Sequence, residues 1–220
     1  MATYILKLTL LSEATFGRGD GVAGLVDTEI EHDERGLPYL HGRGVKGLFT
    51  AQCADLLGAL EQSPAHSKLT QAATRLFGDG GSDLESNGAL SFGHARLPQG
   101  LREAVHAVQP DQLSRTDVVE ALTTIRRQTR IDETTGAAKE DTLRASRVLM
   151  RGLDFHAPIT VERDLDATEQ ALLGACVKAI RRVGSQRARG LGRVRAELFD
   201  ANGNALTEQW MHQFAQEVQA

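Results

Sequence analysis

The chain has few of the residues on which several common protein classes depend. Only 2 of its 220 residues are cysteines, too few for a disulfide framework or a zinc finger. No apolar run approaches the length of a membrane-spanning helix, and residues 1–15 show no signal-peptide pattern. Proline is scarce, with 5 residues, and aromatic residues make up 5%. We therefore expect a cytoplasmic globular protein in which Cys53 and Cys176 are buried free thiols.

Positive charge is also not in excess. Twenty-nine acidic residues oppose 25 Lys and Arg residues, for a formal net charge of −4. Nucleic-acid-binding domains are usually basic, so this number alone argues against that class. The cations, however, are 20 Arg and only 5 Lys. Because Arg makes forked contacts to phosphate and stacks on bases, the sequence still permits a local nucleic-acid surface.

Hydrophobic periodicity predicts the order strand, helix, strand, strand, helix, strand. Apolar residues alternate over residues 4–11 and follow helical spacing over 44–61. The other predicted elements are a helical segment at 67–77, strands at 88–97, 157–163 and 193–199, and helices at 168–183 and 206–219. This order is the ferredoxin-like βαββαβ pattern, an α+β fold with an antiparallel sheet.

We expect residues 1–220 to form a single domain. Its core would comprise residues 3–97 and 156–200, and the C-terminal helix would cover 206–219. Residues 98–155 show weaker periodicity and are expected to be an insertion. Function has to be argued from sites, because this fold class serves many functions.

One Arg-rich segment stands out in a chain of negative net charge. Residues 181–195 contain six Arg and no acid, with Gly184, Gly190 and Gly192 between them. Glycine lets the backbone approach a ligand closely, and Arg adds forked donors, so the segment is suited to phosphate binding. The alternative is an ordinary helix-to-strand turn with solvated Arg. Repulsion within an uncompensated cluster favours the first interpretation, because a nearby anion would relieve it.

Three motifs lie along the chain. The first is the run from Gly184 to Gly192, the second is LPYLHGRGVKG at residues 37–47, and the third is Leu76-Phe77-Gly78 followed by residues 88–92. Together they resemble the RAMP superfamily of CRISPR-associated proteins. The first is similar to the C-terminal glycine-rich signature of that family, and the second is similar to the element that begins its first helix. The repeating backbone subunits of type III effector complexes are the most similar group.

The second motif departs from the family pattern. His41 stands where a proline is usual, and Arg43-Gly44 stands where two small hydroxyl residues are usual. Hydroxyl contacts to an RNA backbone are therefore not expected there. Lys46 and the start of the helix remain available to bind phosphate.

The resemblance implies a catalytic residue in the loop after the first strand. It assigns to Asp27 the role of the family's Asp in metal-dependent cleavage of target RNA. A carboxylate suits a hard cation such as Mg²⁺, or another divalent ion such as Mn²⁺. Asp20, Glu29 and Glu31 are nearby candidates to help. The alternative for each acid is a solvated loop residue.

The resemblance also implies an RNA surface that includes a projecting thumb hairpin within residues 126–151. A salt-bridged surface insertion is the alternative for that segment. Met150 and Phe155, near its end, are expected to lie in the core. The residues expected to bind RNA are Arg18, Arg43, Lys46, Arg126, Arg127, Arg130, Gly184, Arg187, Arg189, Gly190, Gly192 and Arg193.

The function that the resemblance implies is a guide-RNA-binding backbone subunit of a type III CRISPR effector complex. Several copies would line the guide beside other effector subunits, and target RNA would be cut at regular intervals in a metal-dependent manner. One alternative is a scaffold subunit that binds guide RNA without cutting. Another is a guide-processing endoribonuclease that uses a histidine such as His32 as general acid and base.

Overall fold

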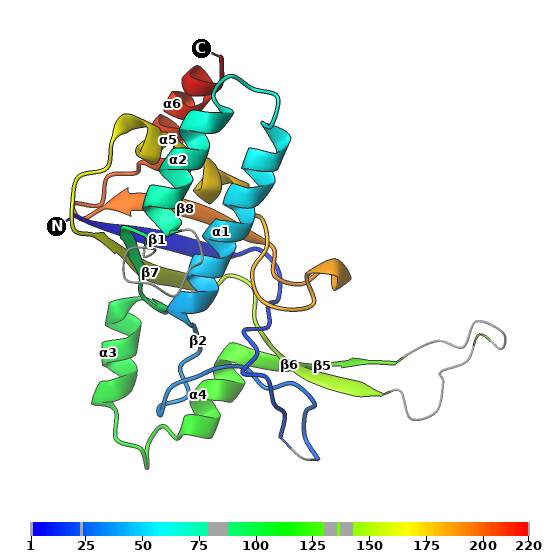
Figure 1. Ribbon diagram of the computed structural model, residues 1–220. Helices are drawn as coiled ribbons and strands as arrows, with labels where there is room; N and C mark the ends of the chain where they lie inside the picture. The colour runs from blue at the N-terminus through cyan, green and yellow to red at the C-terminus, as the bar shows by residue number, and fades with distance from the viewer. Residues whose placement is uncertain (1, 23, 79–87, 130–135, 137–142, 220) are drawn as a thin grey trace.

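A computed structural model describes residues 2–22, 24–78, 88–129, 136 and 143–219 (Figure 1). It is a mixed α+β structure whose described part contains six α-helices and an antiparallel sheet. No helix within these described ranges is long and apolar enough to cross a membrane.

Strand β1 (Ala2–Leu10) lies inside the main sheet, between β7 (Asp154–Val161) and β8 (Val194–Asp200). Both neighbours pair with it antiparallel. Beyond β7 follow β4 (Ala95–Arg96) and β2 (Tyr39–Leu40), which gives the order β2-β4-β7-β1-β8. The short strand β3 (Leu90–Phe92) also pairs with β7. Segments far apart in the chain therefore meet at the centre of the sheet.

The single strand expected at 88–97 is divided into β3 and β4. Phe92 pairs with Ile159, whereas Arg96 pairs with His156, so four steps on one side match three on the other. This is a β-bulge, which interrupts pairing and bends the strand. It falls between Gly93, whose N–H donates to the carbonyl of Pro158, and Arg96. The prediction of one continuous strand was wrong at this bulge.

Helices cover one face of the sheet. Burial alternates along β1, with Leu6, Leu8 and Leu10 fully buried, as expected for a sheet covered on one side. The covering helices, which Figure 1 shows on one side of the sheet, are α1 (Gly42–Ala59), α2 (His66–Phe77), α5 (Ala167–Ala179) and α6 (Thr207–Gln219). Helix α5 lies at their centre, with nine of its 13 residues buried.

Cys53 of α1 and Cys176 of α5 are buried free thiols, as expected. Helix α5 ends earlier than predicted, at Ala179, because the following residues pair with the approach to β8. The N–H of Val183 donates to the carbonyl of Gly192 at 2.8 Å, and Val194 donates back to Arg181.

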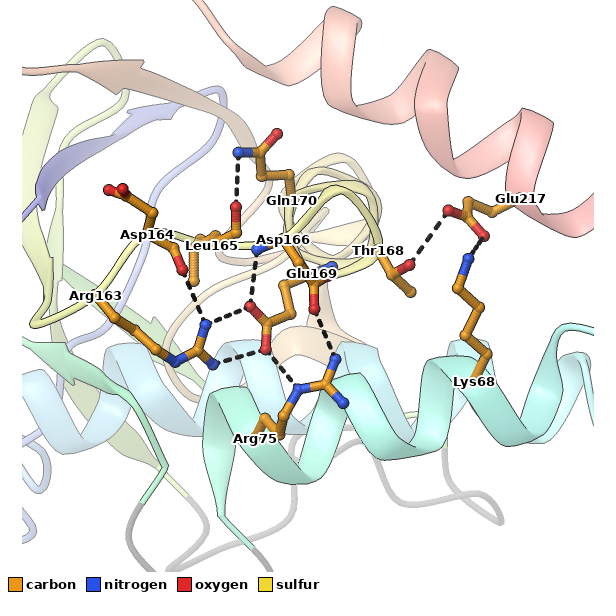
Figure 2. Close-up of polar contacts among 10 residues, drawn as sticks. All are labelled: Lys68, Arg75, Arg163, Asp164, Leu165, Asp166, Thr168, Glu169, Gln170 and Glu217. Carbon is orange, nitrogen blue, oxygen red and sulfur yellow. Dashed lines mark hydrogen bonds and ion pairs between the residues drawn. The ribbon is translucent and has the colours of Figure 1, made fainter.

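A polar network fixes the start of α5, as Figure 2 shows. Asp166 caps the helix, and Asp166 and Glu169 form the reciprocal bonds of a capping box. Glu169 is fully buried and also binds Arg163, which follows β7, and Arg75 of α2. Lys68 of α2 and Thr168 both contact Glu217 of α6. Four elements are tied together there.

The segment 98–155 holds more regular structure than its weak periodicity suggested. It contains α3 (Gln99–Ala107), α4 (Arg115–Leu122) and a hairpin of β5 (Thr123–Gln128) with β6 (Arg144–Leu149). The hairpin is a separate two-stranded sheet, and Figure 1 shows it extending away from the main body. Phe155 is buried as expected, but Met150 is 38% exposed. Met150 follows the last residue of β6, outside the packed core, so its predicted core position was wrong.

Candidate nucleic-acid interface

The glycine-rich loop, residues 184–192, packs its backbone against the loop after β1. Gly184 has a φ of +75°, and a Cβ there would lie 2.3 Å from the carbonyl oxygen of Thr15. Gly192 also has a φ of +75°, and its Cβ would lie 2.0 Å from the carbonyl oxygen of Val183. Gly190, with a φ of +84°, has nothing within 4 Å of that position. Two glycines are thus required by close protein packing, and the third lies in an open stretch.

The segment that carries Asp27 is joined to the edge of the hairpin. The N–H of Asp27 donates to the carbonyl of Ala145 at 2.8 Å, and the N–H of Ala145 donates to Asp27 Oδ2 at 2.7 Å. Thr28 bridges Ser146 in parallel, and its carbonyl accepts from the N–H of Arg147 at 2.9 Å. Asp27 is therefore fixed relative to β6.

A buried ion pair supports the same junction. Arg147 Nε lies 3.0 Å from Glu29 Oε1, and the two side chains are 9% and 5% exposed. Arg147 also donates to Thr123 Oγ1 at 3.2 Å, and Glu29 Oε1 accepts from the N–H of Ile30 at 2.9 Å. Glu29 was a candidate helper for a metal at Asp27. The structure instead commits its carboxylate to Arg147.

The other two acids that were expected to help are also engaged. Asp20 accepts a hydrogen bond from Arg18 Nε. Glu31 accepts from the hydroxyl of Tyr39 at 3.0 Å and lies 3.4 Å from His41 Nε2. No cluster of three or more potential His, Cys, Asp or Glu ligands exists among the residues that the structure describes. Of these four acids, Asp27 is the one with no cationic partner among the described residues.

Three neighbouring hollows form a groove across this surface. The hairpin hollow, of about 750 Å³, lies at the base of the hairpin and is lined by Asp27, Thr28, Gln128, Leu143, Arg144, Ser146, Gln186 and Arg189. The middle hollow, of about 630 Å³, shares Thr28 and Gln186 with it. The helix hollow, of about 160 Å³, lies at the start of α1 and shares Phe16, Gly17 and Leu40 with the middle one. The shared residues place the three hollows next to one another.

The groove brings together part of the predicted RNA-binding set. Arg43 lines the helix hollow, Gly184 and Arg187 line the middle hollow, and Arg189 lines the hairpin hollow beside Asp27. These residues come from α1, from the glycine-rich loop and from the loop after β1. A chain of phosphates passing along the groove would meet a guanidinium in each hollow.

Other predicted residues lie outside the lining of these hollows. Lys46 is half-buried on α1, Arg127 is exposed on β5, and Arg193 is exposed just before β8. Arg126 lies 3.3 Å from a carboxylate oxygen of Glu13. The remaining members of this set are Arg18, which binds Asp20, and Gly190 and Gly192 of the glycine-rich loop. Arg130 lies outside the described residues.

The helix hollow is flanked by a titratable cluster. Tyr39, His41 and His94 pack edge to edge or tilted, with ring centroids 5.0 to 5.3 Å apart. The N–H of Gly42, the first residue of α1, donates to His94 Nδ1 at 2.9 Å. Burial, and then the nearby charge of His41, lower the pKa of His94. Neutral His94 can therefore cap α1, and the residue at the N-cap position, His41, supplies no such bond.

His32, the residue considered for general acid–base chemistry, is held by protein contacts at both ring nitrogens. Its Nδ1 lies 3.0 Å from the carbonyl oxygen of Asp33, and its Nε2 lies 3.2 Å from Arg115 Nη2. A tautomer protonated at Nδ1 satisfies both contacts. The arrangement favours a structural role for His32.

Sequence reasoning missed several residues of the hairpin hollow. Arg144 and Ser146 enter it from β6, and Gln186 enters it from the glycine-rich loop. Gln186 adopts a left-handed conformation, with a φ of 55°, which is uncommon for a residue other than glycine. Its Nε2 donates to Ser146 Oγ at 3.3 Å. Nothing in the sequence around Gln186 indicates this contact, because the partners are 40 residues apart.

The comparisons with known proteins agree with the architecture. No curated protein matches the sequence. A cryo-EM structure of type III-B Cmr-beta in the apo state contains a chain with a TM-score of 0.62 and 12% identity, covering 88% of this chain and 96% of that one. A chain of type III-B Cmr-beta bound to cognate target RNA gives 0.61 and 11%, covering 89% and 96%.

These identities establish a shared fold only. The sequence itself matches a family model from residue 7 to residue 195, which includes the end of β1, the loop that carries Asp27, the hairpin and the glycine-rich loop. This chain belongs to the RAMP superfamily.

Proposed function

We propose that this chain is a guide-RNA-binding backbone subunit of a type III CRISPR effector complex. The observation that carries the proposal is the row of three neighbouring hollows, which are lined in turn by Arg43, by Arg187, and by Arg189 together with Asp27. Membership of the RAMP superfamily and the likeness to chains of type III-B Cmr-beta support it. Guide and target RNA, further copies of this chain and other effector subunits are the proposed partners.

The sheet order supports a ferredoxin-like interpretation of the fold. Strands β8, β1, β7 and β4 lie side by side in that order, all antiparallel, and α1 and α5 follow β1 and β7 in the chain. The hairpin of β5 and β6 is the proposed thumb. Its extension from the body and its attachment beside Asp27 suit an element that contacts RNA at the edge of the groove (Figure 1).

We also propose that target RNA is cut at Asp27 in the presence of Mg²⁺ or Mn²⁺. One oxygen of Asp27 accepts the N–H of Ala145, and the residue lines open space. A single carboxylate fits Mg²⁺, which commonly takes one or two carboxylates together with phosphate oxygens and water. A bound cation would supply positive charge to the reacting phosphate. The backbone bonds between Asp27 and Ala145 hold the carboxylate in place.

The decisive experiment uses the protein reconstituted with guide RNA and an end-labelled target. We expect metal-dependent cuts at regular spacing and a loss of at least 100-fold in rate for Asp27→Asn, with guide and target binding unchanged. Asp20→Asn is the matched control, because Asp20 is an exposed acid of the same loop. Unchanged cleavage by Asp27→Asn would remove Asp27 from the site.

A scaffold subunit that does not cut is the second candidate. It is favoured by the engagement of Glu29 with Arg147, which leaves Asp27 without a neighbouring free carboxylate in the hairpin hollow among the described residues. Complete absence of cuts, with guide retention that weakens in Arg43→Gln or Arg187→Gln, would support it. Chelator-resistant cuts in a guide precursor would instead indicate the histidine-dependent processing enzyme.

A further inference from the structure

The hairpin hollow contains more positive than negative charge. Its described lining has one carboxylate, Asp27, and two guanidiniums, Arg144 and Arg189. Within the described part of the chain, neither Arg lies within 4 Å of a carboxylate, whereas Arg147 and Arg18 nearby are each paired with one. The hollow therefore suits an anion that lies next to an acid.

Arg189 is held at this hollow by a bond to the hairpin. Its Nη1 donates to the amide oxygen of Gln128 on β5 at 3.1 Å. The partner is uncharged, so the contact orients the guanidinium without neutralising it. Among the described residues the guanidinium has no other hydrogen-bond partner, so the rest of the fork can bind a ligand. A second bond, from Gln186 to Ser146, ties the same loop to β6.

The neighbouring Arg187 provides a contrast within the same turn. Arg187, Ala188 and Arg189 form a single 3₁₀ turn, and both Arg side chains are exposed. At three residues per turn, positions two apart point in different directions around the axis. Accordingly, Arg187 lines the middle hollow beside Gly184, whereas Arg189 lines the hairpin hollow beside Asp27. The turn thus presents two cations to two different parts of the groove.

We propose that Arg189 is a catalytic residue that binds the scissile phosphodiester of target RNA, while Arg187 holds the guide backbone. The proposal rests on the proposed function, because it takes the Asp27 hollow to be the place of target cleavage. In the cleavage step the 2′-oxygen bonds to phosphorus and its proton passes to water at the Asp27 carboxylate. The bond to the 5′-oxygen breaks, and that oxygen takes a proton from water.

Negative charge grows on the non-bridging phosphate oxygens as the 2′-oxygen attacks. A guanidinium aimed at those oxygens stabilises the transition state more than the ground state, and it transfers no proton itself. Its orientation by Gln128 means that little reorganisation is needed during the reaction. Loss of one such donor costs on the order of 100-fold in rate.

The test measures single-turnover cleavage at saturating target by guide-loaded protein. We expect Arg189→Gln to lower the cleavage rate about 100-fold. Arg189→Lys keeps the charge but not the fork, so its cleavage rate should lie between those of Arg189→Gln and the unmodified protein. Arg102→Gln is the matched control, because Arg102 lies on α3 outside the lining of the three hollows, and this variant should cleave at the unmodified rate. A normal rate for Arg189→Gln, or equal losses for both Gln variants, would overturn the proposal.

A second measurement separates this inference from the proposed cleavage. The slope of log affinity against log salt reports the number of phosphate contacts. In Arg189→Gln this slope should decrease by about one contact's share for target binding, and in Arg187→Gln it should decrease by the same amount for guide binding. If Asp27→Asn cleaves normally, the cleavage proposal fails, whatever Arg189 does. If the salt slope for target binding is unchanged in Arg189→Gln, the inference fails even where Asp27 proves essential.

Discussion

The carboxylate of Glu169 is expected to be one of the main electrostatic supports of the fold. It accepts two hydrogen bonds from Arg163, at 2.6 and 2.7 Å, and one from Arg75 Nε at 2.8 Å. The N–H of Asp166 donates a further bond at 3.0 Å. Burial alone raises the pKa of Glu169, but these bonds outweigh it and lower the pKa from 4.5 to about 2.

The size of the effect follows from that shift. A fall of about 2.5 units corresponds to about 3.4 kcal/mol of unfolding free energy at neutral pH, since one unit is worth about 1.36 kcal/mol. The two Arg side chains are 45% and 43% exposed, so solvent screening reduces the expected value to about 2 kcal/mol. Glu169→Gln should lose this amount at pH 7, because the amide removes the charge and presents N–H groups to the Arg donors.

The pH dependence supplies the sharper test. Since the folded pKa lies below the unfolded one, the stabilisation is complete above about pH 5 and is lost as the pH falls towards 2. The difference in unfolding free energy between the unmodified and the Glu169→Gln protein, measured with urea, should therefore be less than half as large at pH 2.5 as at pH 7. The exposed Glu162→Gln is the control, with an expected change below about 0.5 kcal/mol at both pH values. A Glu169→Gln difference that does not depend on pH would refute this reasoning.

Three further outcomes are expected. Arg147→Met should lower the free energy of chemical unfolding by about 3–5 kcal/mol, because it leaves the charge of Glu29 buried and unpaired. The double variant with Glu29→Leu should recover most of this stability, and an equal loss in the single and double variants would contradict the prediction. An NMR titration of His94 should give a pKa below 6.5. The stabilisation of α1 by neutral His94 should be present above pH 6.5 and should be lost as the pH falls through the folded pKa of His94. His94→Asn should abolish this pH dependence. Thermal unfolding should show that Gly184→Ala costs more than Gly190→Ala, because both bear the strain of a positive φ but Gly184 alone meets a backbone oxygen; equal costs would argue against the observed packing.

The main elements could be predicted from the sequence because their apolar residues face a core. The alternation that predicted a strand at 4–11 corresponds to the buried face of β1, and the helical spacing at 44–61 corresponds to α1. Helix α3 could not be found in this way, since none of its residues is buried. Helix α4 carried a usable signal, the capping box of Ser114 and Asp117, which weak periodicity concealed.

The candidate site could be predicted only in part. Motif similarity selected Asp27, Arg187 and Arg189, and the structure brings all three to the groove, although their chemical roles stay predictions. Closeness to Asp27 in the sequence also made Glu29 a candidate, but its pairing with Arg147 spans 118 residues of sequence. Local pattern carries no information about such a contact. An acid near a proposed metal can be assigned to that metal only after its other partners are known.

The distribution of ion pairs explains how a chain with a net charge of −4 can present a positive groove. Acids outnumber Lys and Arg, but several of them are consumed in contacts that hold elements together, such as Glu169 in the α5 network and Glu29 at the hairpin. In the described lining of the hairpin hollow, two guanidiniums face one carboxylate. Local potential depends on which charges are left without partners, so the net charge does not predict the sign of a binding surface.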